Sequence, residues 1–335
     1  MLKRLAWLLV AVVIASAAGG GGWYSLQQAQ LQLDSDLYPV AAGSSAGQLC
    51  YNWQQQGLLS STDCLLLRIY LKLNPAAAHV QQGLYRISNE RTLLEVLALF
   101  RSGREAQFSL TFIEGETLAQ AMQRLQSAEY LQLDISSEQQ VLALLQWPAE
   151  WGTTPERAEA LLYPDTYYYT ANSPASNLIK RAQQALLYAL DNAWQQRQGD
   201  LPLQNRYQLL TLASIIEKES SYPPEKTLVA SVFVNRLRKN MRLQTDPTVI
   251  YGLQNFNGNI TRADLNNPHP YNTYRHRGLP PGPIALTSAA SLLAAAQPAQ
   301  TDLYYFVSKG DGTHQFSSTL QQHNAAVKKY IFGEQ

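Results

Sequence analysis

Residues 37–112 change their hydrophobic period several times, and each period predicts a short element. Alternating positions predict strands, whereas apolar positions three and four apart predict helices. The expected order is strand, helix, helix, strand, helix, strand, over residues 37–42, 47–56, 61–71, 83–87, 91–102 and 107–112. Thr92 and Glu95 have the spacing of a capping box for the third helix, and Gly103 stands where that helix should stop. These signals agree with one another and predict a small α+β module.

Residues 113–335 are expected to form a mainly helical region with mixed loops and short strands. Apolar spacing predicts helices over residues 118–127, 137–145, 173–197, 204–219 and 224–239. The sequence YPDT at 163–166, followed by tyrosines at 167–169, interrupts them, because proline does not continue a helix. These tyrosines could stack on sugar rings or form the edge of a packed core. The whole chain is therefore predicted to be α+β.

The N-terminus has the pattern of a membrane segment. Lys3 and Arg4 precede residues 5–24, which carry no charge, and about 20 residues suffice for a helix to cross a bilayer. Basic residues before the span place the N-terminus in the cytoplasm and the rest of the chain outside. A cleaved signal peptide is the alternative, since small residues at 15–17 offer a cleavage site. Residues 25–36 are expected to be a spacer.

The composition limits the classes of function. A chain of 335 residues, 46% of them hydrophobic, is long enough for about two domains. The 26 Lys and Arg residues nearly balance the 25 Asp and Glu residues, so no overall field attracts nucleic acid. A neutral polymer or small molecule is therefore a better candidate for the substrate.

The cysteines and histidines carry little sign of metal chemistry. Cys50 and Cys64 could form a local disulfide in an oxidising compartment or remain as two buried thiols. The five histidines lack metal-ligand spacing, and no nucleophile motif of the Gly-x-Ser-x-Gly type occurs. We therefore expect no metal and no cofactor.

Two glutamates, Glu217 and Glu219, end the helix predicted over 204–219. The helix dipole places partial negative charge at that end and disfavours an ionised carboxyl by about 0.3 to 1 kcal/mol. A carboxyl that stays protonated near neutral pH can serve as a general acid. On a helical projection Glu219 has the more apolar neighbours, so burial should raise its pKa more. Glu219 is the predicted catalytic residue, although either acid alone could be an exposed helix-end carboxylate.

Polar residues in and after the next helix could hold a substrate. Their amide, hydroxyl and carboxylate groups suit the hydroxyl and acetamido groups of sugars. The structural alternative is that Asp246, which precedes Pro247, only forms a turn or a cap. The candidate substrate-binding residues are Asn235, Gln244, Thr245, Asp246, Asn272 and Thr273.

Four ordered motifs resemble those of one enzyme family. They read SIIEKE at 214–219, LQTDPTVIYG at 243–252, YNTY at 271–274 and GLPPGPI at 278–284. Together they closely resemble the MltG (YceG-like) endolytic murein transglycosylases. The YPDT sequence at 163–166 and the Glu114-Gly115 pair are similar to further family motifs. The resemblance covers nearly all of the chain beyond the predicted anchor.

This resemblance implies a single-pass inner-membrane enzyme with most of its chain in the periplasm. The implied parts are an anchor at 1–24, a spacer at 25–36, a LysM-like subdomain at 37–112 and a catalytic domain at 113–335. Such enzymes cut the β-1,4 bond between N-acetylmuramic acid and N-acetylglucosamine inside nascent strands and leave 1,6-anhydro ends. The implied partners are glycan strands, the membrane and peptidoglycan synthases. The family's catalytic glutamate corresponds to Glu219, which Ser220 follows as in other lytic transglycosylases.

One acid suffices for this reaction, because the attacking C6 hydroxyl belongs to the sugar itself and no water needs activation. Two alternatives remain open. A muramidase-type hydrolase would use Asp246 or Glu217 as a second carboxylate. A noncatalytic, membrane-anchored protein would bind glycan or organise wall synthesis. The mass of the product separates the two reactions, since hydrolysis adds water.

Overall fold

The computed structural model describes residue 11 and residues 19–88, 91–152, 154–253 and 255–333. Across these ranges, no helix is long and apolar enough to cross a membrane. The anchor predicted over 1–24 falls mostly on residues outside the described ranges, so it stays a prediction.

The chain divides into two compact units. The first runs to Phe108 and includes Tyr169–Asn172, and the second comprises Ser109–Tyr168 and Ser173–Gln335. Strand β3 (Gln107–Thr111) pairs with β4 (Thr166–Thr170), and the division falls within these two strands. Helices predominate over short two-stranded sheets, which confirms the predicted α+β class.

The first unit has the predicted order of elements. Strand β1 pairs with β2 in an antiparallel sheet, with Leu37 opposite Arg86. Thr92 forms the predicted capping box with Glu95, and Gly103 ends the helix in the left-handed region at φ 67°. The elements before β3 are β1 (Leu37–Val40), α2 (Ala46–Gln55), α3 (Ser61–Leu73), the 3₁₀ turn η1 (Pro75–Ala78), β2 (Gly83–Arg86) and α4 (Leu93–Ser102).

Residues 25–36 were predicted to be a spacer, and the structure corrects this, because they supply part of this unit's core. Residues 19–28 are helical, and Leu26 and Leu31 are each only 2% exposed. The sequence is rich in glutamine, which led to the spacer interpretation, but its leucines pack against the unit's core. A disulfide joins Cys50 on α2 to Cys64 on α3 inside the same core. The first of the two alternatives for the cysteines is therefore the one observed.

The second unit is mainly helical and contains all the predicted helices of its region. Its central helix is α8, which packs against α7, α9, α10 and α12. The helices are α5 (Leu118–Gln126), α6 (Glu138–Ala143), α7 (Ala175–Gln195), α8 (Arg206–Glu219), α9 (Lys226–Arg238), α10 (Asp246–Gly252), α11 (Arg262–Asn266), α12 (Ala289–Ala296) and α13 (Leu320–Tyr330). The 3₁₀ turns η2 (Ala149–Trp151) and η3 (Pro223–Glu225) and the hairpin of β5 (Tyr305–Ser308) and β6 (His314–Ser317) complete it.

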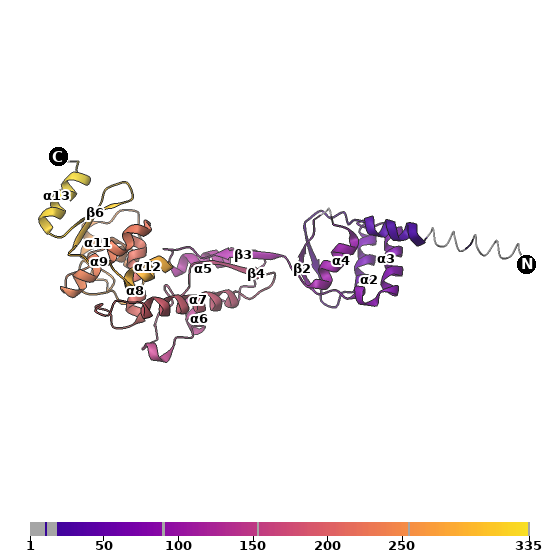
Figure 1. Ribbon diagram of the computed structural model, residues 1–335, viewed down its shortest axis with the longest axis horizontal. Coiled ribbons are helices and arrows are strands. Elements are labelled where there is room, and N and C mark those ends of the chain that lie inside the picture. The colour runs from indigo at the N-terminus through magenta and orange to yellow at the C-terminus, as the bar shows by residue number, and fades with distance from the viewer. Residues whose placement is uncertain (1–10, 12–18, 89–90, 153, 254, 334–335) are drawn as a thin grey trace, which may run out of the picture. The chain divides into compact units, whose positions relative to one another are not determined.

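Helix α8 is buried on every side over residues 209–216, as expected of a helix surrounded by others. Helix α12 consists largely of alanine, so its backbone can approach α8 closely. Helix α8 thus lies among the other helices of the unit (Figure 1). This packing decides the surroundings of the two glutamates at its C-terminus.

The tyrosines after the YPDT sequence lie on strand β4, as the proline predicted. Tyr167 and Tyr169 are buried, whereas Tyr168 between them is 60% exposed. Strand residues alternate between two faces, which explains this pattern. Tyr167 and Tyr169 therefore belong to the packed aromatic core, the second of the two interpretations.

Candidate active site

Glu219 is the last residue of α8. Asn205 caps the start of the helix by accepting a hydrogen bond from the Gln208 amide at 2.9 Å. Ser220 then leaves the helical conformation, and the prolines of η3 prevent its continuation. The sequence thus places a carboxyl group at the negative end of the helix dipole.

Burial raises the pKa of Glu219 to about 7. The nearby Asp246 carboxylate raises this pKa further, while a hydrogen bond from Thr245 and the charges of His314 and Arg236 lower it. The Thr245 hydroxyl donates directly to Oε1 of Glu219. Near neutral pH the carboxyl therefore exists in both its protonated and ionised forms, as a group that gives and takes a proton requires.

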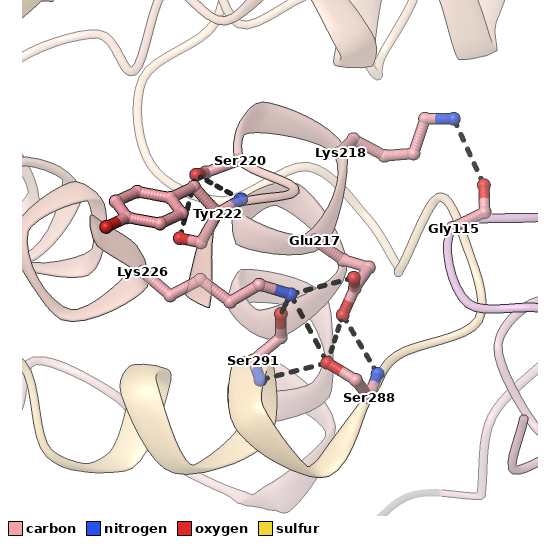
Figure 2. A network of polar contacts seen from close by, with 8 residues as sticks. All are labelled: Gly115, Glu217, Lys218, Ser220, Tyr222, Lys226, Ser288 and Ser291. Carbon is pink, nitrogen blue, oxygen red and sulfur yellow. Dashed lines mark hydrogen bonds and ion pairs between the residues drawn. The ribbon is translucent and has the colours of Figure 1, made fainter. Parts of the chain in front are cut away.

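Glu217, two residues earlier, has the opposite character. Its Oε1 pairs with Nζ of Lys226 at 2.8 Å, and its Oε2 accepts from the amide of Ser288 at 2.9 Å and from the hydroxyl at 2.5 Å (Figure 2). Burial works against ionisation, but the hydrogen bonds from Lys226, Ser288 and Ser291 outweigh it and lower the pKa of Glu217. Glu217 is thus a buried anion that ties α8 to α9 and to the start of α12.

A hydroxyl network holds the loop that contacts Glu219. The Thr245 amide donates to Oγ1 of Thr273 at 3.1 Å, and Thr248 and Thr273 share a hydrogen bond of 2.8 Å. Thr245 and Thr273 are at most 2% exposed. Gln244, just before, has a φ of +49°, an uncommon conformation for a residue with a side chain. The predicted residue Thr245 therefore positions the Glu219 carboxyl, and the predicted residue Thr273 in turn holds Thr245. Gln244 is exposed beside Glu219.

Asp246 and Tyr274 form a second polar pair near Glu219. The Tyr274 hydroxyl donates to Oδ1 of Asp246 at 2.6 Å. Asp246 also begins α10, so the turn interpretation and the site interpretation are both consistent with its position. Both side chains line a cavity together with Glu219.

Neither predicted asparagine lines the two cavities that Glu219 borders, and their substrate-binding role stays a prediction. The Asn235 amide donates to the carbonyls of Thr301 and Leu303 at 2.9 and 3.0 Å. The Asn272 amide donates to the Asn267 carbonyl at 2.7 Å, and its oxygen accepts from the Tyr274 amide at 2.9 Å. Both side chains are buried and brace loops. Sequence alone could not reveal these backbone partners.

Glu219 lines two cavities. The first, of about 990 Å³, is also bounded by Glu114, Tyr163, Asp165 and Lys218. Lys218 crosses to the Gly115 carbonyl at 3.0 Å, which fixes the Glu114-Gly115 step beside the helix end (Figure 2).

The second cavity, of about 430 Å³, lies between the loop around Asp246 and the C-terminal hairpin and helix. Its lining includes Arg236, Gln244, Tyr305 and His323.

Arg236 and Lys226 are the main residues that the sequence interpretation missed. Arg236 is 8% exposed, and it donates through Nε to the Tyr304 carbonyl and through Nη1 to the Leu243 carbonyl, each at 2.7 Å. Its spacing from Val232 and Phe233 put it on the buried face of α9, a signal available in the sequence.

Among the described residues, no group of His, Cys, Asp and Glu is placed to hold a metal.

The profile of the YceG-like family matches residues 38–329. The chain belongs to the YceG-like family. An endolytic murein transglycosylase of Bacillus subtilis (strain 168) is 31% identical over 315 residues, which are 87% of this chain and 84% of the relative. One from Streptococcus pneumoniae (serotype 2, strain D39) is 29% identical over 183 residues, 52% of this chain and 32% of that longer protein.

A solved structure also resembles this chain and comes from a YceG-like protein. The crystal structure of a YceG-like protein from Listeria monocytogenes matches this one with a TM-score of 0.55 and 28% identity. The match covers 86% of this chain and 97% of the other. The family resemblance drawn from the motifs is confirmed.

Proposed function

We propose that this chain is a peptidoglycan lytic transglycosylase in which Glu219 is both acid and base. The observation that carries the proposal is a half-buried carboxyl group with a pKa of about 7 that lines two cavities at once. Support comes from relatives described as endolytic murein transglycosylases. A carboxyl flanked by space on two sides suits a glycan strand that continues past the cleaved bond.

The proposed reaction begins when protonated Glu219 donates to the glycosidic oxygen. The bond from that oxygen to C1 of the muramyl sugar breaks, its electron pair stays on the oxygen, and positive charge develops at C1. The C6 hydroxyl of the same sugar attacks C1 and gives its proton to the Glu219 carboxylate. A 1,6-anhydro ring forms, and the carboxyl group returns to its starting state without added water.

The bond we propose is the β-1,4 bond between N-acetylmuramic acid and N-acetylglucosamine. Cleavage inside a nascent strand would end its elongation. Thr245 holds the Glu219 carboxyl in place, and exposed Gln244 and Asp246 offer polar groups to the sugars.

A muramidase-type hydrolase needs a second carboxylate to activate water. Glu217 is poorly suited to this role, because Lys226 and Ser288 engage both of its oxygens. Asp246 favours a hydrolase, since it lines a cavity with Glu219, and Glu114 and Asp165 also share the larger cavity with Glu219. A noncatalytic scaffold, by contrast, gives no reason for a carboxyl with a pKa near neutrality at a cavity.

We further propose that the chain is a single-pass inner-membrane protein whose larger part lies in the periplasm. The uncharged stretch at 5–24 after Lys3 and Arg4 supports this, and the buried disulfide suits an oxidising compartment. The LysM-like subdomain over 37–112, the catalytic domain over 113–335 and peptidoglycan synthases as partners belong to the same proposal. Protease treatment of spheroplasts tests the orientation, because the bulk of the chain should be digested.

The activity is tested by mass spectrometry of fragments released from glycan strands by the detergent-solubilised protein. We expect muramyl ends lighter by one water than the hydrolysis product, no cleavage by Glu219→Gln, and full cleavage by Glu150→Gln. Glu150 is an exposed residue of η2 and makes the same chemical change away from both cavities. Products with added water would favour the hydrolase, and undiminished cleavage by Glu219→Gln would remove the assignment.

A further inference from the structure

The smaller cavity beside Glu219 contains a buried cation with one unused edge. Arg236 lines this cavity, and its Nε and Nη1 are engaged by the Tyr304 and Leu243 carbonyls. Within the described part of the chain, Nη2 makes no hydrogen bond. A guanidinium group that is 8% exposed and already clamped at two nitrogens is a rigid donor. Its remaining edge is therefore available to an acceptor oxygen inside the cavity.

An acceptor belongs to the same cavity. Asp246 lines it, and Tyr274 occupies only Oδ1 of its carboxylate. Although both residues line the cavity, the described structure contains no ion pair within 4.0 Å between Arg236 and Asp246. The cavity thus presents a separate positive donor and a separate negative acceptor.

The third feature of the cavity is apolar. Phe306 and Leu320 contribute to its lining, and Leu320 is 55% exposed at the start of α13. A small apolar group entering here would lose contact with water against these side chains.

These three features select the chemistry of the ligand. A carboxylate would be attracted by Arg236 but repelled by Asp246, and an ammonium group would meet the reverse, so neither charge suits both residues. A neutral secondary amide has an acceptor, a donor and, in an acetamido group, a methyl. It can satisfy both charged residues without bringing a charge of its own.

We propose that this cavity binds the acetamido group of the sugar at the cleaved bond, an inference that rests on the proposed function. The carbonyl oxygen accepts from Nη2 of Arg236, the N–H donates to Oδ2 of Asp246, and the methyl packs on Leu320. An acetamido group is attached at C2, next to the anomeric carbon, so one cavity can hold it while Glu219 reaches the glycosidic oxygen. Arg236 is then a specificity-determining residue.

The test combines variants with modified strands. The full chain in detergent is assayed on native strands, on strands freed of stem peptides by an amidase, and on N-deacetylated strands with a re-acetylated control. We expect deacetylation to lower wild-type kcat/KM at least about tenfold, as for a lost hydrogen bond to a charged group. Removal of stem peptides should leave the dependence on Arg236 unchanged.

Arg236→Lys keeps the positive charge. The lysine ammonium group, however, cannot hold the Tyr304 and Leu243 carbonyls and also present a fixed donor to the cavity. It should lower activity on acetylated strands, and the penalty for deacetylation should shrink by about tenfold. Arg206→Lys is the matched control, since Arg206 is also largely buried but pairs with Asp191 away from both cavities. The loss of kcat/KM on deacetylated strands should be the same for Arg206→Lys as for the wild type.

Leu320→Ala keeps the inference testable if Arg236→Lys fails to fold, because Leu320 is exposed. It should raise KM by about threefold on acetylated strands and leave deacetylated strands unaffected. Equal deacetylation penalties in the wild type and both cavity variants would overturn the inference. Arg236-dependent losses on removal of stem peptides would assign the amide to the peptide and also overturn it. Absence of any cleavage by the wild type would instead contradict the proposed function.

Discussion

Replacing Glu219 with Gln should remove activity and, at alkaline pH, make the protein more stable. Burial raises the pKa of Glu219 in the folded protein to about 7 from an ordinary value of 4.5. The folded state therefore keeps its proton over a pH range in which the unfolded chain has lost it. Stability from this group is fully present below about pH 4.5 and is lost as pH rises through 7. The neutral amide of Gln does not undergo this loss.

The size of the effect follows from the pKa. The rise from 4.5 to about 7 corresponds to about 3 kcal/mol at 1.36 kcal/mol per pKa unit. Partial exposure of Glu219 to solvent reduces this to about 2 kcal/mol. For a unit of this size, 2 kcal/mol changes the melting temperature by about 4 to 8 °C.

Thermal unfolding of wild type and Glu219→Gln at pH 4.5 and pH 8 measures the effect. Asp246, His314 and Arg236 are the charged groups that face Glu219, and all three are kept in the variant. We expect the variant to gain about 4 to 8 °C over the wild type between the two pH values. Glu217→Gln is the control, because the pKa of that carboxyl lies below its ordinary value of 4.5, so its difference from the wild type should stay nearly constant between pH 4.5 and pH 8. A pH-independent difference for Glu219→Gln would refute the reasoning.

Three further predictions concern the surroundings of the site and the first unit. Thr245→Val removes a hydrogen bond that lowers the pKa of Glu219, so the alkaline limb of the pH profile of kcat/KM should move to higher pH; an unmoved limb would exclude this coupling. Lys226→Met should lower the free energy of unfolding by about 3 to 5 kcal/mol, because it leaves Glu217 buried and unpaired, and adding Glu217→Gln should recover most of it in a denaturant titration. Reduction of the Cys50–Cys64 disulfide should cost the first unit about 3 kcal/mol but leave the cleavage rate at 25 °C unchanged; a parallel loss of activity would contradict this.

Local signals in the sequence predicted helix α4 of the first unit closely. The capping box of Thr92 and Glu95 and the stop at Gly103 act within one helix, so neighbouring residues determine them. The choice of Glu219 over Glu217 rested on a helical projection. The structure adds a stronger physical reason, because Lys226 and Ser288 hold Glu217 as an anion.

The remaining features depend on contacts between distant segments. The carbonyls that engage Asn235 come from residues 301 and 303, so its polar side chain looked available in sequence. The hairpin of β5 and β6 and helix α13 were not predicted, although they form one wall of the smaller cavity. The position of Arg236 at a cavity could be recognised only from the fold, which places that wall beside it. Spacing along a helix showed that it is buried, and only the fold shows what it faces.

The proton on the Glu219 carboxyl can be followed directly. With ¹³C-labelled glutamate, the carboxyl signal absent from Glu219→Gln is that of Glu219, and its chemical shift is measured against pH. We predict a midpoint of about 7, with kcat/KM falling over the same range as the proton is lost. A midpoint near the ordinary value of 4.5 would show that Glu219 is ionised at neutral pH and would contradict its role as the acid.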